Sequence, residues 1–251
     1  MKNVKILLFA IAILLSFSVS KAQNKTIGIG RLQVSLNYDI PLYNKETGVS
    51  IDTIKFSIIE SGEDEGKFIT TTKFSLKPIE YYAGDSKKEA ESHVNDGLIY
   101  FAPCLSFRVL RDSNNEYEVV LNEESFETAI IKNDTIHKLY TVGEPYWNMS
   151  HSNSRYSKNP NETWFLYETW DIYLKRMMFI STEGNKLYDN INGTEIDSRI
   201  IDWTVIKVTG DWAMLRERED SLNRGKRKQY AWVRWTDGEK FLINLYPEVY
   251  Y

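Results

Sequence analysis

The feature that most constrains the fold of this chain is an internal repeat. Residues 42–52 align without gaps on residues 187–197, and five of the 11 positions are identical. Three more blocks recur downstream in the same order: 107–111 on 203–207, 117–121 on 212–216, and 129–132 on 231–234. Four matches in one order predict a duplicated domain, because each copy then carries the same succession of short elements.

The spacing between the copies locates an insertion in the first one. The four blocks are offset by 145, 96, 95 and 102 residues. The drop from 145 to 96 means that the first copy carries about 49 additional residues, at about 55–104. We therefore expect a first domain over 23–140 with this insertion, a loop and connecting helix over 141–179, and a second domain over 180–251.

Both copies have the pattern of a small β-barrel. Each consists of short runs rich in β-branched and aromatic residues, separated by turns, with no long helical period. Thr209-Gly210-Asp211, for example, is a hairpin signal between two such runs. The chain contains one cysteine, so no intramolecular disulfide can hold either copy together. Closing the sheet removes exposed strand edges, which predicts a mainly β protein with two small barrels.

Three groups of residues within about 183–247 form a recognisable pattern. They are Leu187-Tyr188-Asp189 with Gly193, Trp203 and Val205 before Gly210-Asp211-Trp212-Ala213, and Ala231-Trp232-Val233 with Trp235 and Gly238. With these residues the second copy resembles the bacterial Src-homology-3-like domains of exported proteins. The resemblance implies a small β-barrel and a cell-envelope setting. It implies no reaction, because such barrels commonly serve as ligand-binding or targeting modules beside other domains.

The layout of the whole chain carries a second likeness. The stretch Thr169-Trp170-Asp171-Ile172-Tyr173-Leu174 precedes the second copy. In this respect the chain resembles uncharacterised signal-bearing proteins of Bacteroidetes type, in which a similar segment comes before such a domain. The likeness again implies an exported protein and indicates no chemistry.

Residues 1–22 are typical of a secretory signal peptide. Two lysines precede an apolar stretch, 6–19, which is broken only by two serines. Small residues, Ser20 and Ala22, then stand at the two positions that a signal peptidase reads. The alternative is a membrane anchor, but 14 residues are too few to span about 30 Å of hydrocarbon. We expect an exported protein, periplasmic or at the cell surface, with no transmembrane segment after cleavage.

The charge balance bears on the kind of partner. The chain has 31 Lys and Arg against 35 Asp and Glu, a formal net charge of −4. Three of the lysines lie in the predicted signal peptide, so the remainder has 28 basic residues and a net charge of −7. Nucleic-acid binders depend on a basic surface that neutralises phosphates. The composition therefore argues against a nucleic-acid partner.

The segment between the copies predicts a surface loop followed by a helix. Residues 146–161 are rich in Asn, Ser and Tyr, and Asn161-Glu162-Thr163 offers a cap for a helix from about Trp164 to Phe179. One broad face of this helix would be apolar, with Phe165, Trp170, Tyr173, Leu174 and Met177. This face is either an exposed aromatic binding surface or the side of a helix packed across or between the barrels, and its helical spacing favours packing.

The sequence offers no recognisable catalytic motif. It has no Gly-x-Ser-x-Gly, no His-Glu-x-x-His, no phosphate-cradling glycine loop and no paired cysteines. We therefore predict no catalytic residue, metal or cofactor, and interpret the chain as a non-catalytic module that binds a cell-wall glycan, a peptide or an envelope protein. The alternative is a hydrolase with its site in the inserted region or at the domain junction, using dispersed acids or His93.

Candidate ligand-binding residues lie in the last third of the chain. On the strand expected in the closing block, Trp232 points opposite to Trp235, so one of these tryptophans lies on a more exposed face. Lys226 and Arg227 belong to a basic run, 224–228, in an otherwise acidic chain. This run either meets an anionic glycan, a lipid headgroup or an acidic partner, or is a solvated loop. The candidates are therefore Trp232, Trp235, Arg234, Lys226 and Arg227.

A last expectation concerns Trp212, which aligns with Tyr117 at an offset of 95 residues. Both faces of its strand carry apolar side chains, so alternation alone leaves the core face open. The alignment favours the Trp212 face, because Tyr117 repeats a large residue there whereas Ala213 aligns with the charged Glu118. We therefore expect Trp212 to lie in the core of the second barrel.

Overall fold

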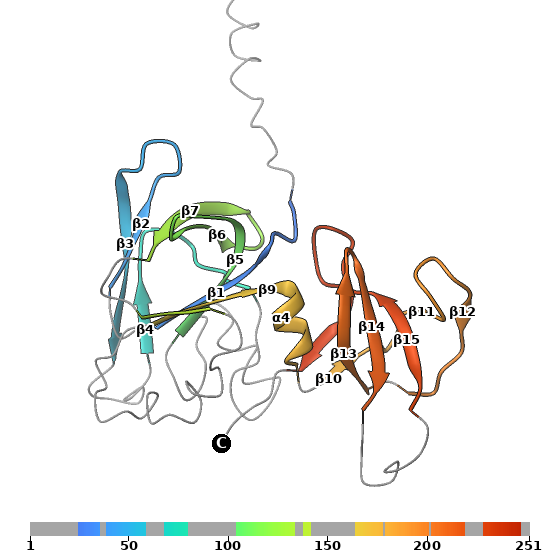
Figure 1. Cartoon of the computed structure of the whole chain (residues 1–251). Coiled ribbons are helices and arrows are strands. Elements are labelled where there is room, and N and C mark those ends of the chain that lie inside the picture. Colours follow the sequence, from blue (N-terminus) through green and yellow to red (C-terminus); the bar gives the residue numbers. More distant parts are fainter. Residues whose placement is uncertain are drawn as a thin grey trace, which may run out of the picture.

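The computed structural model describes residues 25–35, 39–58, 68–79, 104–133, 138–141, 164–177, 179–200, 202–218 and 228–246. In this part of the chain two β-sheets lie side by side, with helix α4 (Trp170–Lys175) between them (Figure 1). Strands make up nearly all of the regular structure, so the expectation of a mainly β protein is confirmed. The predicted signal peptide lies outside the described residues, and so do residues 59–67 and 80–103 of the expected insertion.

The first sheet has nine strands. They are β1 (Gly30–Ser35), β2 (Ile40–Tyr43), β3 (Ser50–Ile58), β4 (Phe68–Thr71), β5 (Cys104–Ser113), β6 (Glu116–Asn122), β7 (Glu127–Lys132), β8 (Lys138–Thr141) and β9 (Trp164–Thr169). Their order is β4-β3-β2-β7-β6-β5-β1-β9-β8, with β8 and β9 parallel. Alternate residues of these strands form one core, which includes Leu32, Ile40, Phe107, Tyr117 and Phe165.

The second sheet has seven strands. They are β10 (Phe179–Ser181), β11 (Leu187–Tyr188), β12 (Glu195–Ile196), β13 (Asp202–Thr209), β14 (Trp212–Glu217), β15 (Tyr230–Arg234) and β16 (Asn244–Tyr246). Their order is β12-β11-β15-β14-β13-β10-β16. The core on its inner face includes Trp203, Val205, Ala213, Leu215, Ala231, Val233 and Trp235. Side chains from α4 complete this core, so the helix belongs to the second unit as much as to the connection.

The two sheets share a strand order over six strands. The first contains β3-β2-β7-β6-β5-β1 and the second contains β12-β11-β15-β14-β13-β10. The hairpins β5–β6 and β13–β14 also share a register, because Val109 pairs with Val119 and Val205 pairs with Leu215. Each ladder is irregular at the next step, after Val109 and after Val205. The two hairpins lie in separate sheets and are not neighbours within one.

These registers correct the expected position of Trp212. The shared pairing makes Ala213, and not Trp212, the equivalent of Tyr117. Ala213 is fully buried, whereas Trp212 is partly exposed and outside the core. The expectation that Trp212 fills the core is wrong, since a shift of one residue exchanges the two faces of a strand. The large aromatic side chain in the core of this hairpin is Trp203.

The segment that follows residue 163 also differs from its predicted form. Residues 164–169 form strand β9, which pairs with β1 and β8, and only the next six residues are helical. The run Trp-Phe-Leu-Tyr is aromatic and apolar on both faces, which suits a strand inside a sheet better than a helix with one polar side. In α4, Trp170, Tyr173 and Leu174 are buried in the second core. Of the two alternatives for the apolar side of this segment, packing inside the protein is therefore the correct one.

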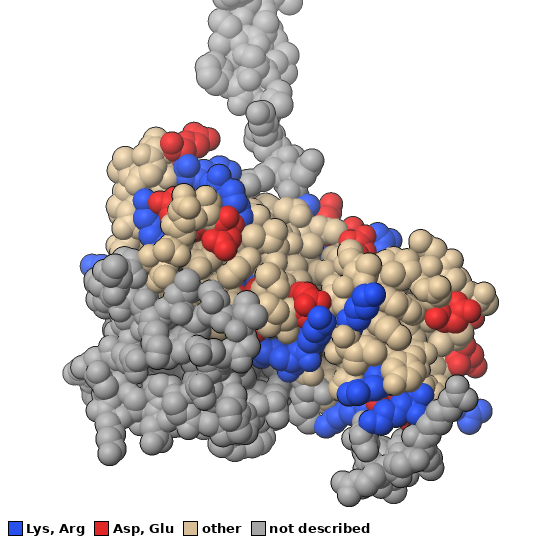
Figure 2. All heavy atoms as spheres, viewed as in Figure 1, with Lys and Arg blue, Asp and Glu red and all other residues tan. Residues whose placement is uncertain are grey.

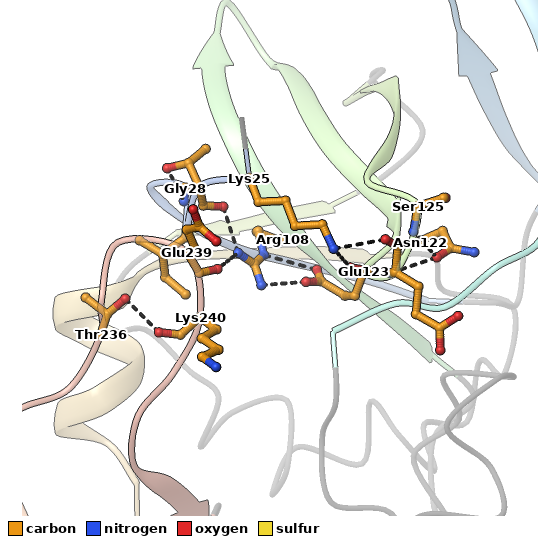
Figure 3. A network of polar contacts seen from close by, with 12 residues as sticks. Lys25, Gly28, Arg108, Asn122, Glu123, Ser125, Thr236, Glu239 and Lys240 are labelled. Atoms are coloured by element: carbon orange, nitrogen blue, oxygen red, sulfur yellow. Dashed lines mark hydrogen bonds and ion pairs between the residues drawn. The ribbon is translucent and has the colours of Figure 1, made fainter. Parts of the chain in front are cut away.

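Arg108 joins the two halves of the chain (Figure 3). Its guanidinium forms a two-point ion pair with Glu123, and 3.1 Å separate Arg108 Nε from Glu123 Oε1. Its Nη1 also donates to the carbonyl oxygens of Thr26, at 2.7 Å, and Glu239, at 2.5 Å. Burial raises the pKa of the Glu123 carboxyl, against the opposing effect of Arg108. One buried side chain thus links β5 to the segment before β1 and to the turn after β15.

Gly28 lies where the segment before β1 crosses this junction. Its φ is +72°, and a Cβ there would lie 2.2 Å from the carbonyl oxygen of Val109. Next to it, Trp170 Nε1 donates to the carbonyl oxygens of Ile27 and Gly28, both at 3.0 Å. The close approach and the left-handed backbone both require glycine at this position.

We expect Gly28→Ala to lower the free energy of unfolding by roughly 1–3 kcal/mol, because the new methyl group must displace backbone. Urea denaturation measures this change. Gly48→Ala is the matched control, since Gly48 also has a positive φ, +67°, but nothing within 4 Å of its Cβ position. It should cost only about 1 kcal/mol. Equal losses in the two variants would show that the contact with Val109 contributes nothing.

Candidate functional site

The outer face of the second sheet carries a group of partly exposed aromatic and apolar side chains. We call this group the aromatic face, and it consists of Tyr188, Trp212, Met214, Tyr230 and Trp232. Cross-strand pairing brings its members together, because Trp232 on β15 lies directly between Tyr188 on β11 and Met214 on β14. These three strands are neighbours inside the sheet, so the group lies on a continuous surface and not at an edge.

The alternation of the strands explains why these side chains point outward. In β14 the buried residues are Ala213 and Leu215, and in β15 they are Ala231 and Val233. On these two strands alanine, leucine and valine side chains therefore face the core, and the larger rings between them face the other way. A tryptophan and a tyrosine on the solvent side of a sheet do not contribute to this core. These rings instead form part of the solvent-facing surface of the sheet.

The rings are held in a defined arrangement. Tyr188 and Trp212 form an edge-to-face pair, with ring centroids 5.3 Å apart and an interplanar angle of 83°. Tyr230, at the other end of the group, is 52% exposed and is one of the most exposed large side chains in the described part of the molecule. The edge-to-face pair is a favourable geometry for aromatic rings and limits their rotation. The aromatic face is therefore partly preorganised.

Two ion pairs border the aromatic face. Arg234 Nη2 lies 3.4 Å from Asp211 Oδ2, and Lys186 Nζ lies 2.8 Å from Glu195 Oε2. The hydrogen bond and the charge of Glu195 raise the pKa of the Lys186 ammonium. A hollow of about 520 Å³ lies beside the second pair, lined by 184–187 and 195–198. These groups place hydrogen-bond donors and acceptors around the rings.

Basic side chains gather at the lower end of this sheet, where β14 ends and β15 begins (Figure 2). Arg216 pairs with Tyr230 across the ladder, and Arg218 and Lys228 follow at the ends of the two strands. Arg218 lies over the ring of Phe179, 4.8 Å from its centroid. The whole chain is acidic, so this concentration of positive charge is local.

The equivalent face of the first sheet carries different side chains. By register, Tyr188 corresponds to Tyr43, Met214 to Glu118, and Trp212 to Glu116. There the two glutamates pair with Lys45, Arg111 and Lys132. Figure 2 shows the resulting mixture of basic and acidic atoms over the first unit. At two of these positions the first sheet thus carries paired glutamates, whereas the second sheet carries the partly exposed Trp212 and Met214.

The structure describes three of the five residues proposed from the sequence and places them in two environments. Trp232 and Arg234 lie on the outer face of β15, and the prediction that one tryptophan of the closing block is more exposed is confirmed. Trp235 is 4% exposed, and its Nε1 donates to the carbonyl oxygen of Gly210 at 2.9 Å. It is a core residue, so its assignment to the ligand site is wrong. Lys226 and Arg227 lie outside the described residues.

Four members of the aromatic face were not proposed from the sequence. They are Tyr188, Trp212, Met214 and Tyr230. An offset of 96 residues for the third block, in place of 95, would have placed Trp212 on the outer face beside Trp232. The signal was therefore present in the repeat, but a one-residue error in the alignment concealed it.

The buried carboxylates are engaged by arginines. Glu168, 3% exposed, forms a two-point ion pair with Arg176, and Arg31 Nε lies 3.4 Å from its Oε2. Burial would raise the pKa of Glu168, but Arg176 and Arg31 outweigh burial and hold the pKa below its usual value. Both guanidinium groups also lie over the ring of Tyr173. This arrangement is that of a structural ion cluster.

The three histidines lie outside the described residues.

The described ranges contain neither a metal-binding cluster of side chains nor a membrane-spanning helix. No group of three or more His, Cys, Asp or Glu side chains in these ranges is placed to hold a metal ion. No helix in them is long and apolar enough to cross a membrane.

Comparison of the chain with family models, curated proteins and solved structures finds no significant match.

Proposed function

We propose that this chain is a non-catalytic binding module and that its aromatic face binds a saccharide. The observation that carries the proposal is the cluster of Tyr188, Trp212 and Trp232 on the solvent side of a sheet. Aromatic rings offer flat apolar surfaces to the C–H faces of a sugar ring, and polar groups around them orient its hydroxyls. The ion pairs of Arg234 and Lys186 supply such groups.

The position of the face favours a saccharide over an extended peptide. Peptides that add a strand need an unpaired sheet edge, and the edges of this sheet are β12 and β16. The strands β14 and β15 are each paired on both sides, so their backbone groups are already satisfied. A ligand of the aromatic face is thus bound through side chains. Ring stacking with peripheral hydrogen bonds meets that requirement.

The proposal extends to the origin and setting of the two units. We propose that they are copies of one Src-homology-3-like barrel, the first with an insertion, and that the chain works in the cell envelope. The shared strand order and the ladder irregularity after Val109 and Val205 support the duplication. The apolar, lysine-led segment 1–22 supports export. On this account the second copy carries the binding surface and the first copy supports it.

A comparison of equivalent tyrosines tests the proposed site. Affinity electrophoresis of residues 23–251 through gels containing a panel of soluble cell-wall and matrix polysaccharides should show retardation by at least one. Tyr188→Ala should weaken that binding about tenfold or more, as expected for an aromatic side chain at the centre of a contact.

The matched control is Tyr43→Ala, at the same position of the first sheet. Its ring contacts Lys132 within the chain and lies outside the proposed site, so binding should remain as in the wild type. Equal loss of binding in both variants would indicate a general effect on folding. Binding that survives Tyr188→Ala would refute the aromatic face as the site.

A further inference from the structure

We infer that the saccharide recognised by this face is acidic, and that Arg216 binds its carboxylate or sulfate group. The inference rests on the proposed function, because it assigns a chemical class to the ligand of the same surface. It starts from the position of Arg216 on β14, two residues beyond Met214 and directly opposite Tyr230. The guanidinium is therefore carried by the same side of the sheet as the rings.

Arg216 lacks the partners that the other cations of this face possess. Arg234 is paired with Asp211, and Lys186 is paired with Glu195. Arg216 Nε is buried without a hydrogen-bond partner, and no side chain in the described ranges forms an ion pair with this guanidinium. Its backbone is engaged in the ladder, since Thr204 Oγ1 donates to the Arg216 carbonyl oxygen at 3.1 Å. The backbone of Arg216 is thus engaged, whereas its Nε has no partner.

An unpaired, partly buried guanidinium is costly, and a ligand oxyanion would remove that cost. A buried donor without a partner loses its hydration and gains nothing in return. Arginine presents a planar fork of N–H groups that matches a carboxylate or a sulfate, and such charge-assisted hydrogen bonds are the strong ones. Tyr230 beside it, 52% exposed, offers a ring to the sugar that carries this group. The pair therefore suits a sugar acid or a sulfated sugar.

The first sheet shows that this charge is not needed for the architecture. By register, the equivalent of Arg216 is Val120, which pairs with Arg108 as Arg216 pairs with Thr204. Val120 is fully buried. An apolar residue thus satisfies the sheet at this position in one copy. The other copy places an unpaired cation there, beside exposed rings and at the basic end of the sheet (Figure 2).

Affinity electrophoresis with charge-matched pairs of polymers tests the inference. Residues 23–251 are run through gels containing polygalacturonate or its methyl ester, and dextran sulfate or dextran. We expect retardation by one or both acidic polymers at an affinity at least tenfold above that for the neutral counterpart. The first pair reports a carboxylate and the second a sulfate ester, so the two sources of the anion are distinguished.

Three variants assign the effect to this side chain. Arg216→Gln should reduce retardation by the acidic polymer about tenfold or more, and Arg216→Lys should restore part of it, because lysine keeps the charge and loses the fork. Arg111→Gln is the matched control, since Arg111 lies on the first sheet beside Glu118 and should have no effect. Thermal melting of each variant verifies that the chain is folded.

The outcomes separate this inference from the proposed function. Two outcomes would overturn the inference of an acidic ligand and leave the proposed function standing. One is equal retardation by the acidic and neutral forms, and the other is unchanged binding in Arg216→Gln while Tyr188→Ala abolishes binding. Retardation by neither member of either pair also overturns the acidic ligand. Retardation that persists in Tyr188→Ala overturns the proposed function itself.

Discussion

Trp203→Ala is expected to reduce the free energy of unfolding by about 3–5 kcal/mol, the range for emptying a large buried aromatic site. Trp203 has no exposed surface, is the largest fully buried side chain of the described structure, and donates from Nε1 to the carbonyl oxygen of Ile200 at 3.1 Å. Removal of the ring leaves both a cavity and an unpaired carbonyl group. Such a loss is a large fraction of the roughly 5–15 kcal/mol that stabilises a typical domain, so the urea midpoint should fall clearly. Urea titration followed by circular dichroism measures it.

Trp212→Ala is the matched control for this prediction. Trp212 lies on the same hairpin, but its ring is partly exposed and packs mainly on Tyr188. We expect its loss to cost no more than about 1.5 kcal/mol, the scale of one aromatic pair. If Trp212→Ala proved as damaging as Trp203→Ala, the assignment of the two faces of β14 would be wrong.

Glu168→Gln is expected to destabilise the protein by about 3–5 kcal/mol, because it removes the carboxylate that faces the buried guanidinium of Arg31 and pairs with Arg176. Arg31 and Glu168 are each about 4% exposed at their side chains, and Arg176 is 18% exposed. Water therefore cannot replace the lost carboxylate at Arg31. Chemical denaturation at pH 7 measures the change.

The same variant predicts a pH dependence with a definite sign. The pKa of Glu168 in the folded protein lies below its ordinary value of 4.5. The stability that Glu168 contributes is therefore present above about pH 4.5 and is lost as the pH falls through the lowered pKa of the folded state. The difference between wild type and Glu168→Gln should shrink below pH 4.5. A difference that grows on acidification would contradict the ion cluster.

An exposed glutamate, Glu116, serves as the control for the buried Glu168. Glu116 pairs with Lys132 at 2.8 Å, with side-chain exposures of 46% and 35%. Glu116→Gln should cost less than about 1 kcal/mol, since surface ion pairs contribute little. A large loss in this variant would mean that the polar face of the first sheet is structural in its own right.

The sequence predicted the hairpins and misjudged one register. Short runs separated by turns were enough to indicate β5–β6 and β13–β14, because their turns carry strong signals. The faces of β14 were assigned incorrectly, since a gapless match of five residues cannot reveal where a ladder is irregular. The irregularity after Val205 becomes visible only when its partner strand is in place.

The prediction of a helix over 164–179 was wrong for a different reason. Aromatic residues at spacings of three and four suited a helix, but the first six residues entered the sheet between β1 and β8. Tertiary pairing therefore overrode local pattern. This outcome could not be predicted from the segment alone, because both of its partner strands lie elsewhere in the chain.

The candidate site was predicted in part. Alternation correctly separated Trp232 from Trp235 and left their exposures open, and the structure places Trp232 outside and Trp235 in the core. Tyr188 belongs to the site because β11 pairs with β15, a contact between segments more than 40 residues apart. Such juxtaposition depends on strand order, which periodicity does not contain. Arg216 was passed over because a lone basic residue in a strand gives no signal by itself.

The central claim is that the aromatic face contacts the ligand, and the indole N–H signals in ¹H–¹⁵N spectra test it most directly. The buried indoles of Trp170, Trp203 and Trp235 donate to backbone carbonyl oxygens inside the chain. The probe is an oligosaccharide prepared from the polysaccharide that retards the protein. The account predicts that the signals of Trp212 and Trp232 shift on titration while those three stay in place. Shifts confined to the buried indoles, or binding without any change at Trp212 and Trp232, would contradict it.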